Sequence, residues 1–188
     1  LIADQCLLTN VSWDDLDVQG LVFGKEVTVQ GLRFKIRLLK VGSEKGVPNE
    51  WDAALDAVGE DDTLWHWDHK FFWGQEPVSG SASHRAYRGY NSARHWNWCH
   101  SSLRNASLGF RPALEPLPTD PSAIRHSQEV FVIGTAGAAV GSLIDATAYD
   151  LVIQPNADGL IGEVSFAAKM QDGTLVVDRS EIISIATA

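Results

Sequence analysis

The chain has 188 residues, a formal net charge of −9, seven Trp and two Cys. This length allows one large domain, or one medium and one small domain, and the acidic balance argues against a nucleic-acid footprint over the whole surface. We therefore expect no nucleic-acid partner. We also expect no membrane span, because no apolar run approaches the roughly 20 residues that cross a bilayer. The two cysteines, Cys6 and Cys99, are too few for a disulfide framework, and a single bridge between them stays open.

Two short helices are predicted in the first third of the chain. Ser12 is suited to cap the first helix, because its hydroxyl can accept a hydrogen bond from a free backbone N–H of the first turn, and Gly20 ends it. Asn49 caps the second helix in the same way, and Gly59 ends it. The apolar residues of the second helix recur at helical spacing: Trp51, Ala54, Leu55 and Val58.

A β-hairpin is predicted between the two helices. Residues 25–29 and 32–39 alternate apolar and polar side chains on either side of Gln30-Gly31. The apolar face of this hairpin consists of Val27, Val29, Phe34, Ile36 and Leu38. After the second helix, residues 63–73 hold an aromatic cluster. Residues 74–93 are rich in Gly, Ser and Ala without a helical period, which predicts mostly loop.

The run 114–121 predicts a domain boundary, because its closely spaced prolines prevent regular structure. Beyond it, short β-branched runs with turn signals at Asp158-Gly159 and Asp172-Gly173 predict a small all-β unit. The predicted strands are 130–133, 143–153, 160–167 and 175–185. We therefore expect two domains, 1–117 and 118–188, and the second is small enough to need support from a neighbour.

The segment 84–111 carries the pattern from which a function is predicted. No acid occurs between Glu76 and Glu115, so the arginines of this region predict a local positive patch. At least half of them are expected to pair with the acidic remainder of the chain. The arginines are Arg85, Arg88, Arg94, Arg104 and Arg111.

Aromatic and small polar residues alternate around Trp96 and Trp98. In an extended chain successive side chains face opposite sides, so we expect both indoles to pack in the core and His95, Asn97 and Cys99 to face solvent. Tyr, Ser and Asn are also frequent here and give adaptable contact surfaces; a solvated strand without a ligand is the alternative. The predicted ligand contacts are His84, Tyr87, Tyr90, Asn91, His95, Asn97, Cys99, His100, Ser101 and Asn105. The predicted scaffold residues are Arg88, Gly89, Trp96, Trp98, Gly109, Phe110 and Arg111.

Short motifs in this region resemble a known family. Arg88-Gly89-Tyr90, Ser92-Ala93-Arg94 and above all Leu108-Gly109-Phe110-Arg111 are similar to the closing segment of the formylglycine-generating-enzyme type of C-type-lectin fold. Variable proteins of diversity-generating retroelements and many phage and prophage proteins belong to the same branch. The resemblance extends over about residues 10–117 through Trp13, the 24–39 hairpin, Asn49-Glu50-Trp51 and Trp73-Gly74-Gln75.

The resemblance implies an α+β fold class, with a C-type-lectin-like domain followed by a small all-β domain. It implies that the protein binds a protein or glycan ligand on a cell surface through residues 84–107. It also implies that the protein itself is located on a virion or a cell surface rather than in the cytoplasm. Whether it forms a homo-oligomer is left open. In retroelement systems, adenine replacement in Asn codons yields Tyr, His, Ser, Ala, Cys or Asp but never Trp. The predicted contacts therefore fit varied positions, and Trp96 and Trp98 fit fixed ones.

Two alternatives remain, an oxidoreductase similar to the formylglycine-generating enzyme and a structural part of a phage particle. Enzymes of this family carry a pair of cysteines near the closing motif that bind copper. Only Cys99 lies there in this chain, so we expect no enzyme.

Three further motifs each have some features of a ligand site. His66-Trp67-Asp68-His69 has the residue types of a zinc site without the usual spacing. Gln154-Pro155-Asn156 is similar to the calcium-and-sugar tripeptide of true C-type lectins but lacks a Trp-Asn-Asp partner. Residues 134–137 follow a predicted strand as a phosphate loop does, but no Lys follows them. We therefore expect no metal and no cofactor.

Overall fold

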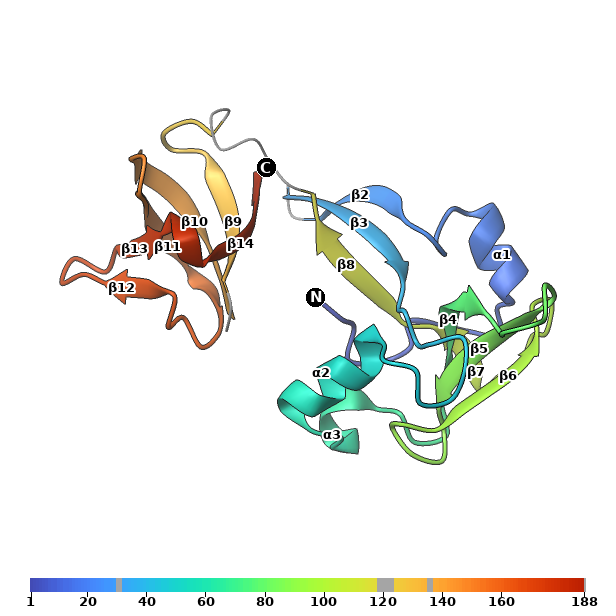
Figure 1. Ribbon diagram of the computed structural model, residues 1–188. Helices are drawn as coiled ribbons and strands as arrows, with labels where there is room; N and C mark the ends of the chain where they lie inside the picture. Colours follow the sequence, from blue (N-terminus) through green and yellow to red (C-terminus); the bar gives the residue numbers. More distant parts are fainter. Residues whose placement is uncertain (30–31, 118–123, 135–136, 188) are drawn as a thin grey trace. The chain divides into compact units, whose positions relative to one another are not determined.

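The computed structural model describes residues 1–29, 32–117, 124–134 and 137–187 (Figure 1). Within these residues the protein is mostly β, with 48% strand and 12% helix arranged as three sheets and three short α-helices. The expected α+β class, with a lectin-like domain followed by a small all-β domain, is therefore wrong. Part of the difference lies in residues 74–93, for which the sequence predicts mostly loop but of which 74–77 and 84–89 belong to two strands.

The chain forms two compact units. The first unit contains Leu1–Lys25 and Ile36–Glu115, and the second contains Glu26–Lys35 and Pro116–Ala188. The chain passes from one unit to the other inside a strand, β3 (Leu32–Leu38). Each unit has its own apolar core.

The first unit is built on a five-stranded sheet with the order β1-β7-β4-β5-β6. Its strands are β1 (Leu8–Thr9), β4 (Phe71–Pro77), β5 (His84–Gly89), β6 (Trp96–His100) and β7 (Leu108–Phe110). β4 and β7 are parallel, and the other neighbours are antiparallel. Gly74 shows why composition suggested a loop here. A Cβ at this position would lie 2.0 Å from Cγ2 of Val41, so the strand needs glycine for close packing rather than for a turn.

The helices of the first unit are α1 (Trp13–Val18), α2 (Glu50–Val58) and α3 (Asp62–Trp65). Both predicted N-caps are confirmed. The Ser12 hydroxyl accepts the backbone N–H of Asp15, whose carboxylate accepts the Ser12 N–H in return. Asn49 Oδ1 accepts the Asp52 N–H at 2.9 Å. Val58 corrects the predicted apolar face of α2, because its side chain is 58% exposed.

A three-stranded sheet has the order β2-β3-β8, with β2 at Lys25–Val29 and β8 at Pro112–Pro116. The two predicted hairpin strands are confirmed, and their turn, Gln30-Gly31, lies outside the described residues. Phe34 and Leu38 are buried as expected, but Val29 is 43% exposed. β8 also corrects the expectation that the proline-rich run is irregular from Leu114 onward. Its prolines stand at the two ends of the strand, where a missing N–H interrupts the ladder least, and residues 118–123 lie outside the described part of the chain.

Two apolar clusters fill the first unit, one on each face of the five-stranded sheet. Trp51 and Leu55 of α2 pack with Phe72 and Ala86 on what we call the α2 face. On the opposite α1 face, the α1 residues Trp13 and Leu16 pack in a second cluster. Its sheet members are Trp73, Leu108 and Phe110, with Phe71, Tyr87 and Cys99 partly buried against them.

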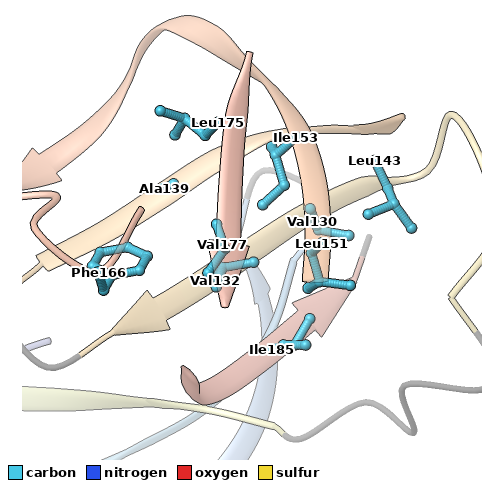
Figure 2. Packing of buried hydrophobic residues seen from close by; sticks show 10 residues of the cluster. All are labelled: Val130, Val132, Ala139, Leu143, Leu151, Ile153, Phe166, Leu175, Val177 and Ile185. Atoms are coloured by element: carbon cyan, nitrogen blue, oxygen red, sulfur yellow. The ribbon is translucent and has the colours of Figure 1, made fainter. Parts of the chain in front are cut away.

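The second unit contains a six-stranded sheet with the order β12-β13-β11-β10-β9-β14. Its strands are β9 (Glu129–Gly134), β10 (Gly137–Ala146), β11 (Asp150–Gly162), β12 (Ala167–Lys169), β13 (Leu175–Asp178) and β14 (Ile182–Thr187), with a 3-10 turn at Arg179–Glu181. Figure 2 shows side chains from these strands converging on one core, against which the ring of Phe166 packs.

Of the two turns predicted in the second unit, one is present and the other is not. The turn at Asp172-Gly173 is confirmed, with Gly173 at φ 86°. Asp158-Gly159 lies inside β11 instead, where the ladder to β10 changes register. The predicted strand 130–133 lies within β9, whereas each of the other three predicted runs crosses a turn or a strand end. Of the glycine-rich run 134–137, residues 135–136 lie outside the described part of the chain.

Removing the Asp52 carboxylate should strongly destabilise the first unit. Arg88 Nη2 bonds Asp52 Oδ2 at 2.8 Å, and the Arg88 side chain is 3% exposed. Asp52→Ala therefore leaves a buried cation without its carboxylate, and we expect the free energy of unfolding to fall by about 3 kcal/mol. All seven Trp lie in the first unit, so Trp fluorescence during urea unfolding reports on this unit.

Asp56→Ala is the matched control, one turn further along α2. Asp56 pairs with Arg94 at 2.6 Å, but its side chain is 71% exposed. Exposed pairs of this kind contribute about 0–1 kcal/mol. Equal losses for the two variants would contradict burial as the cause.

Candidate ligand-binding site

β5 and β6, at one margin of the five-stranded sheet, hold half of the predicted contact residues. Ala86 lies opposite Trp98, and Tyr87 lies opposite Asn97. Facing residues of an antiparallel pair share one side of the sheet, so the predicted contacts divide between two faces. The α2 face carries His84, Trp98 and His100, and the α1 face carries Tyr87, Asn97 and Cys99. The expectation of a single polar surface is therefore corrected.

Trp98 differs from every other tryptophan of the chain. The six others each donate their indole N–H to a backbone carbonyl oxygen at 2.8–3.0 Å. Among the residues that the structure describes, the Trp98 N–H has no such acceptor. Its side chain is also 48% exposed, although the facing Ala86 is fully buried. The expectation that Trp98 packs in the core is wrong, whereas Trp96 is half-buried and donates to Gly42 O at 3.0 Å.

A cavity of about 270 Å³ lies beside Trp98, and we call it the Trp98 pocket. Its lining residues are Val78, Ser79, Ser81, His84 and Trp98. The His84 ring stands edge-on to Trp98, with ring centroids 4.9 Å apart and an interplanar angle of 89°. Ser81 Oγ lies 2.7 Å from His84 Nδ1 and fixes the orientation of the imidazole. An apolar wall with a few placed polar groups is typical of small-ligand sites.

His100 lies next to His84, although it does not line the cavity itself. Its ring lies 5.7 Å from that of His84, at 77°. Ser102 Oγ lies 2.8 Å from His100 Nδ1. Because His100 is exposed, it can offer a ring nitrogen to a ligand seated on Trp98. The two imidazoles are thus each held by a serine hydroxyl at the rim of one exposed indole.

The α1 face is a packed aromatic cluster rather than an open pocket. Tyr90 stacks on Phe71 at 4.5 Å between centroids and 14° between planes. Tyr87 meets the same ring edge-on at 4.8 Å, and His95 lies 6.1 Å from it. Asn97 is exposed, and its Oδ1 accepts the backbone N–H of Trp98 at 2.8 Å. These side chains mainly contact one another.

The remaining predicted residues are scattered. Cys99 is half-buried against the α1-face cluster, and Ser101 is only 7% exposed, so neither lies on an open surface as expected. Asn91 and Asn105 are exposed, and Asn105 Oδ1 accepts the Ser107 N–H at 2.7 Å. The other predicted scaffold residues are buried: Arg88, Gly89, Gly109, Phe110 and Arg111.

Three of the five arginines in the expected positive patch are neutralised by acids that the fold brings to them. Arg88 pairs with Asp52, Arg94 with Asp56 and Glu60, and Arg104 with Asp15. Hydrogen bonds from Arg104 and Ser12 hold the pKa of the Asp15 carboxyl well below its usual range. Arg85 lies over the Trp13 ring at 4.0 Å, and the buried Arg111 donates to backbone carbonyls. The expectation that at least half of these arginines are paired is confirmed.

The two cysteines are free thiols in different clusters, Cys6 on the α2 face and Cys99 on the α1 face. Burial raises the pKa of Cys6, and it raises the pKa of Cys99 to about 11. Because the thiolate is the nucleophile and metal ligand, neither thiol is activated in this environment.

A second cavity, of about 280 Å³, lies beside Cys6. It is lined by Gln5, Cys6, Asp62, His66, Asp68 and Lys70. This cavity includes part of the His66-Trp67-Asp68-His69 motif. Among the described residues, no group of three or more His, Cys, Asp or Glu is arranged to hold a metal ion. Nor is any helix in the described part of the chain long and apolar enough to cross a membrane.

Comparisons with family models, curated proteins and solved structures gave no match to this chain. The Trp98 pocket is therefore interpreted from its own geometry.

Trp98→Ala should leave the first unit nearly as stable as the wild type. The ring is half exposed, and surface substitutions change the free energy of unfolding by about 1 kcal/mol or less. Trp73→Ala, on β4, removes a ring that is fully buried and should lose about 3–5 kcal/mol. Urea unfolding followed by circular dichroism compares the two. A loss at Trp98 as large as that at Trp73 would mean that Trp98 is structural.

Alkylation of Cys99 by iodoacetamide should be slow at neutral pH and accelerate only towards the thiol pKa of about 11. The physical reason is that burial favours the neutral thiol in the folded chain. Mass spectrometry of the Cys99 peptide measures the rate against pH. The urea-unfolded chain is the reference, and there the rate should rise near the free-cysteine pKa of about 8.5. Superimposable pH profiles would show that the fold does not bury this thiol.

Proposed function

We propose that this protein is a ligand-recognition module that holds a sugar ring of a glycan on Trp98. The observation that carries the proposal is the combination of a half-exposed indole, an indole N–H without an acceptor among the described residues, and an adjoining cavity of about 270 Å³. Large aromatic side chains are normally buried, and a buried indole N–H normally finds a partner. Here the protein leaves both the ring and its donor available to a ligand.

The chemistry of the pocket favours a sugar over a charged ligand. A pyranose presents a flat C–H face that can lie on an aromatic ring, and hydroxyl groups at its rim that donate and accept hydrogen bonds. The Trp98 ring supplies the apolar platform, and the imidazoles of His84 and His100 with Ser81 supply the polar rim. The arginines that could attract an anion are engaged elsewhere.

Binding rather than hydrolysis is proposed, because glycoside hydrolysis normally uses two carboxyl groups flanking the bond. The residues lining the Trp98 pocket include no Asp or Glu among those that the structure describes. Glu76, two residues before Val78, accepts the Val41 N–H at 3.0 Å through Oε2, and Asp52, Asp56 and Glu60 pair with arginines.

The retroelement hypothesis assigns Trp98 a particular part in this surface. Adenine replacement does not create Trp from an Asn codon, so Trp98 would be a fixed anchor. The exposed His100 would be a varied position beside it on the α2 face, whereas Asn97 lies on the opposite face. This diversification stays a prediction from the sequence.

Titration with methyl glycosides of glucose, galactose, mannose and N-acetylglucosamine tests the proposal by NMR. The seven indole N–H resonances report on the seven Trp, and Trp98→Ala assigns one of them. At least one glycoside should move the Trp98 resonance first, with a dissociation constant of about 1 mM for one sugar ring. Trp98→Ala should weaken that binding by at least about tenfold, which is 1.4 kcal/mol.

Tyr149→Ala is the control, because Tyr149 is an aromatic residue of the second unit with 79% exposure. It should bind the glycosides as the wild type does. Binding that persists in Trp98→Ala, or a panel that moves no indole resonance, would overturn the glycan proposal. Saturable binding of a peptide at Trp98 in the absence of sugar binding would replace it with a protein ligand.

A further inference from the structure

The outer edge of β6 has no strand partner among the described residues, because β6 ends the five-stranded sheet (Figure 1). Gly89 N–H donates to His95 O at 3.2 Å, and Ser101 N–H donates to Ser83 O at 2.8 Å. The odd-numbered residues of this segment therefore exchange backbone bonds with β5. In an antiparallel pair the alternate residues direct their N–H and C=O groups away from the partner strand. On β6 these outward residues are Trp96, Trp98 and His100.

β6 lacks the features that protect the other edge strands of the chain. Short strands, charged side chains, proline and bulges are the usual ways in which an edge avoids pairing. Two of these edge strands are short: β1 has two residues, and β12 has three, one of which is Lys169. β2 carries the charged residues Lys25 and Glu26, and β14 has a register irregularity. The edge of β8 is partly covered, because its Leu114 N–H donates to Leu1 O. β6 has five residues, a regular ladder and no Lys, Arg, Asp, Glu or Pro.

We propose that β6 pairs with β6 of a second copy of this chain, antiparallel and in a register centred on Trp98. In this register Trp98 faces Trp98 of the second copy, Trp96 faces His100, and Asn97 faces Cys99. The two five-stranded sheets would then continue across the two-fold axis. The inference is independent of the glycan proposal, because it uses the edge of the strand and the pocket uses its face.

A second copy fits this edge because the strand is complementary to itself. A two-fold interface uses the same patch on both subunits, so each residue must suit its counterpart. Around Trp98, an aromatic ring faces an aromatic ring, a second indole faces an imidazole, and a neutral amide faces a thiol. No Lys, Arg, Asp or Glu lies on the strand to repel its copy or to select a differently charged partner.

Three features oppose the pairing and make it weak. The His100 C=O already accepts the Leu103 N–H at 3.0 Å, so pairing must share or exchange this bond. The backbone N–H of Trp98 already donates to Asn97 Oδ1 at 2.8 Å, so pairing exchanges this bond for one to the second copy. Each chain also has a formal charge of −9, and like charges repel across the interface. Salt screens such repulsion, so association should strengthen as ionic strength rises.

Pairing would place the two Trp98 rings side by side on the same face of the extended sheet. Each Trp98 pocket would then have a copy across the two-fold axis. A branched or repeating ligand that reaches both would bind with higher avidity than a single ring.

Asn97→Cys tests the register directly. In the proposed pairing, residues 97 and 99 of the two copies form a facing pair that exchanges no backbone bonds, with Cα atoms about 4.5 Å apart. That separation suits a disulfide. With diamide as the oxidant, which takes up two electrons and two protons per disulfide, most of the chain should become a covalent dimer. Peptide mass mapping should find the thiol introduced at position 97 joined to Cys99 of the second copy.

The double variant Asn97→Cys, Cys99→Ser is the matched control, and it should form no more dimer than the wild type. Circular dichroism checks that both variants fold, as the exposure of Asn97 leads us to expect. Equal cross-linking of the double variant would overturn the proposed register.

Sedimentation equilibrium of the unmodified chain provides a measurement that needs no variant. The mass should rise from monomer towards dimer between micromolar and millimolar concentrations, and more steeply at high salt. Asn97→Ala frees the backbone N–H of Trp98, so it should shift the midpoint of the monomer–dimer transition to a several-fold lower protein concentration. A monomer at every concentration overturns the proposal. If that monomer captures an added extended peptide at β6, the partner is another protein.

Discussion

The buried guanidinium of Arg88 holds together the segments on which the candidate site depends. It lies on β5, and its nitrogens donate to Val41 O, to Arg94 O and to the Asp52 carboxylate. These acceptors belong to the segment before α2, the turn before β6 and α2 itself. Burying a charge is strongly unfavourable unless its donors are satisfied, so this arrangement fixes the three segments together. Since Arg88 faces Trp96 in the ladder, the register that places Trp98 beside His84 follows from it.

The features that could be predicted from the sequence are those determined locally. The N-caps at Ser12 and Asn49 depend on bonds within four residues, and both have the expected geometry. The exposure of Trp98 could not be predicted in this way. Alternation correctly separates Trp98 from Asn97. Both faces of the sheet are covered over β4 and β5, but on β6 the cover reaches Trp96 and Cys99 and leaves Trp98 half exposed. Ala86 is therefore fully buried while Trp98, directly opposite, is half exposed. Position across the sheet decides burial here, not the face alone.

Electrostatics were also determined by residues distant in sequence. A run of arginines without neighbouring acids suggests a positive surface, but α1 and the region of α2 bring Asp15, Asp52, Asp56 and Glu60 to it. Apart from Arg85, which lies over the Trp13 ring, what remains at the margin of β5 and β6 is neutral, aromatic and hydrogen-bonding. Attraction over long range therefore contributes little to recognition at Trp98, and short-range contact with the ring and the two imidazoles must supply it.

The area of the Trp98 ring limits the affinity that a single site can reach. This limit gives a reason why the exposed face of β6 and its unpaired edge occur on the same strand. A Trp side chain buries about 150–250 Å², and about half of this ring is exposed, so covering it stabilises a complex by about 2–3 kcal/mol at roughly 25 cal/mol per Å². A dissociation constant of about 1 mM corresponds to a binding free energy of roughly 4 kcal/mol, which is more than the ring supplies. Hydrogen bonds to the polar rim have to supply the difference. A protein that relies on one such ring needs several copies to bind a surface firmly. The same strand that displays the ring also has an unprotected edge through which a second ring could be brought beside it.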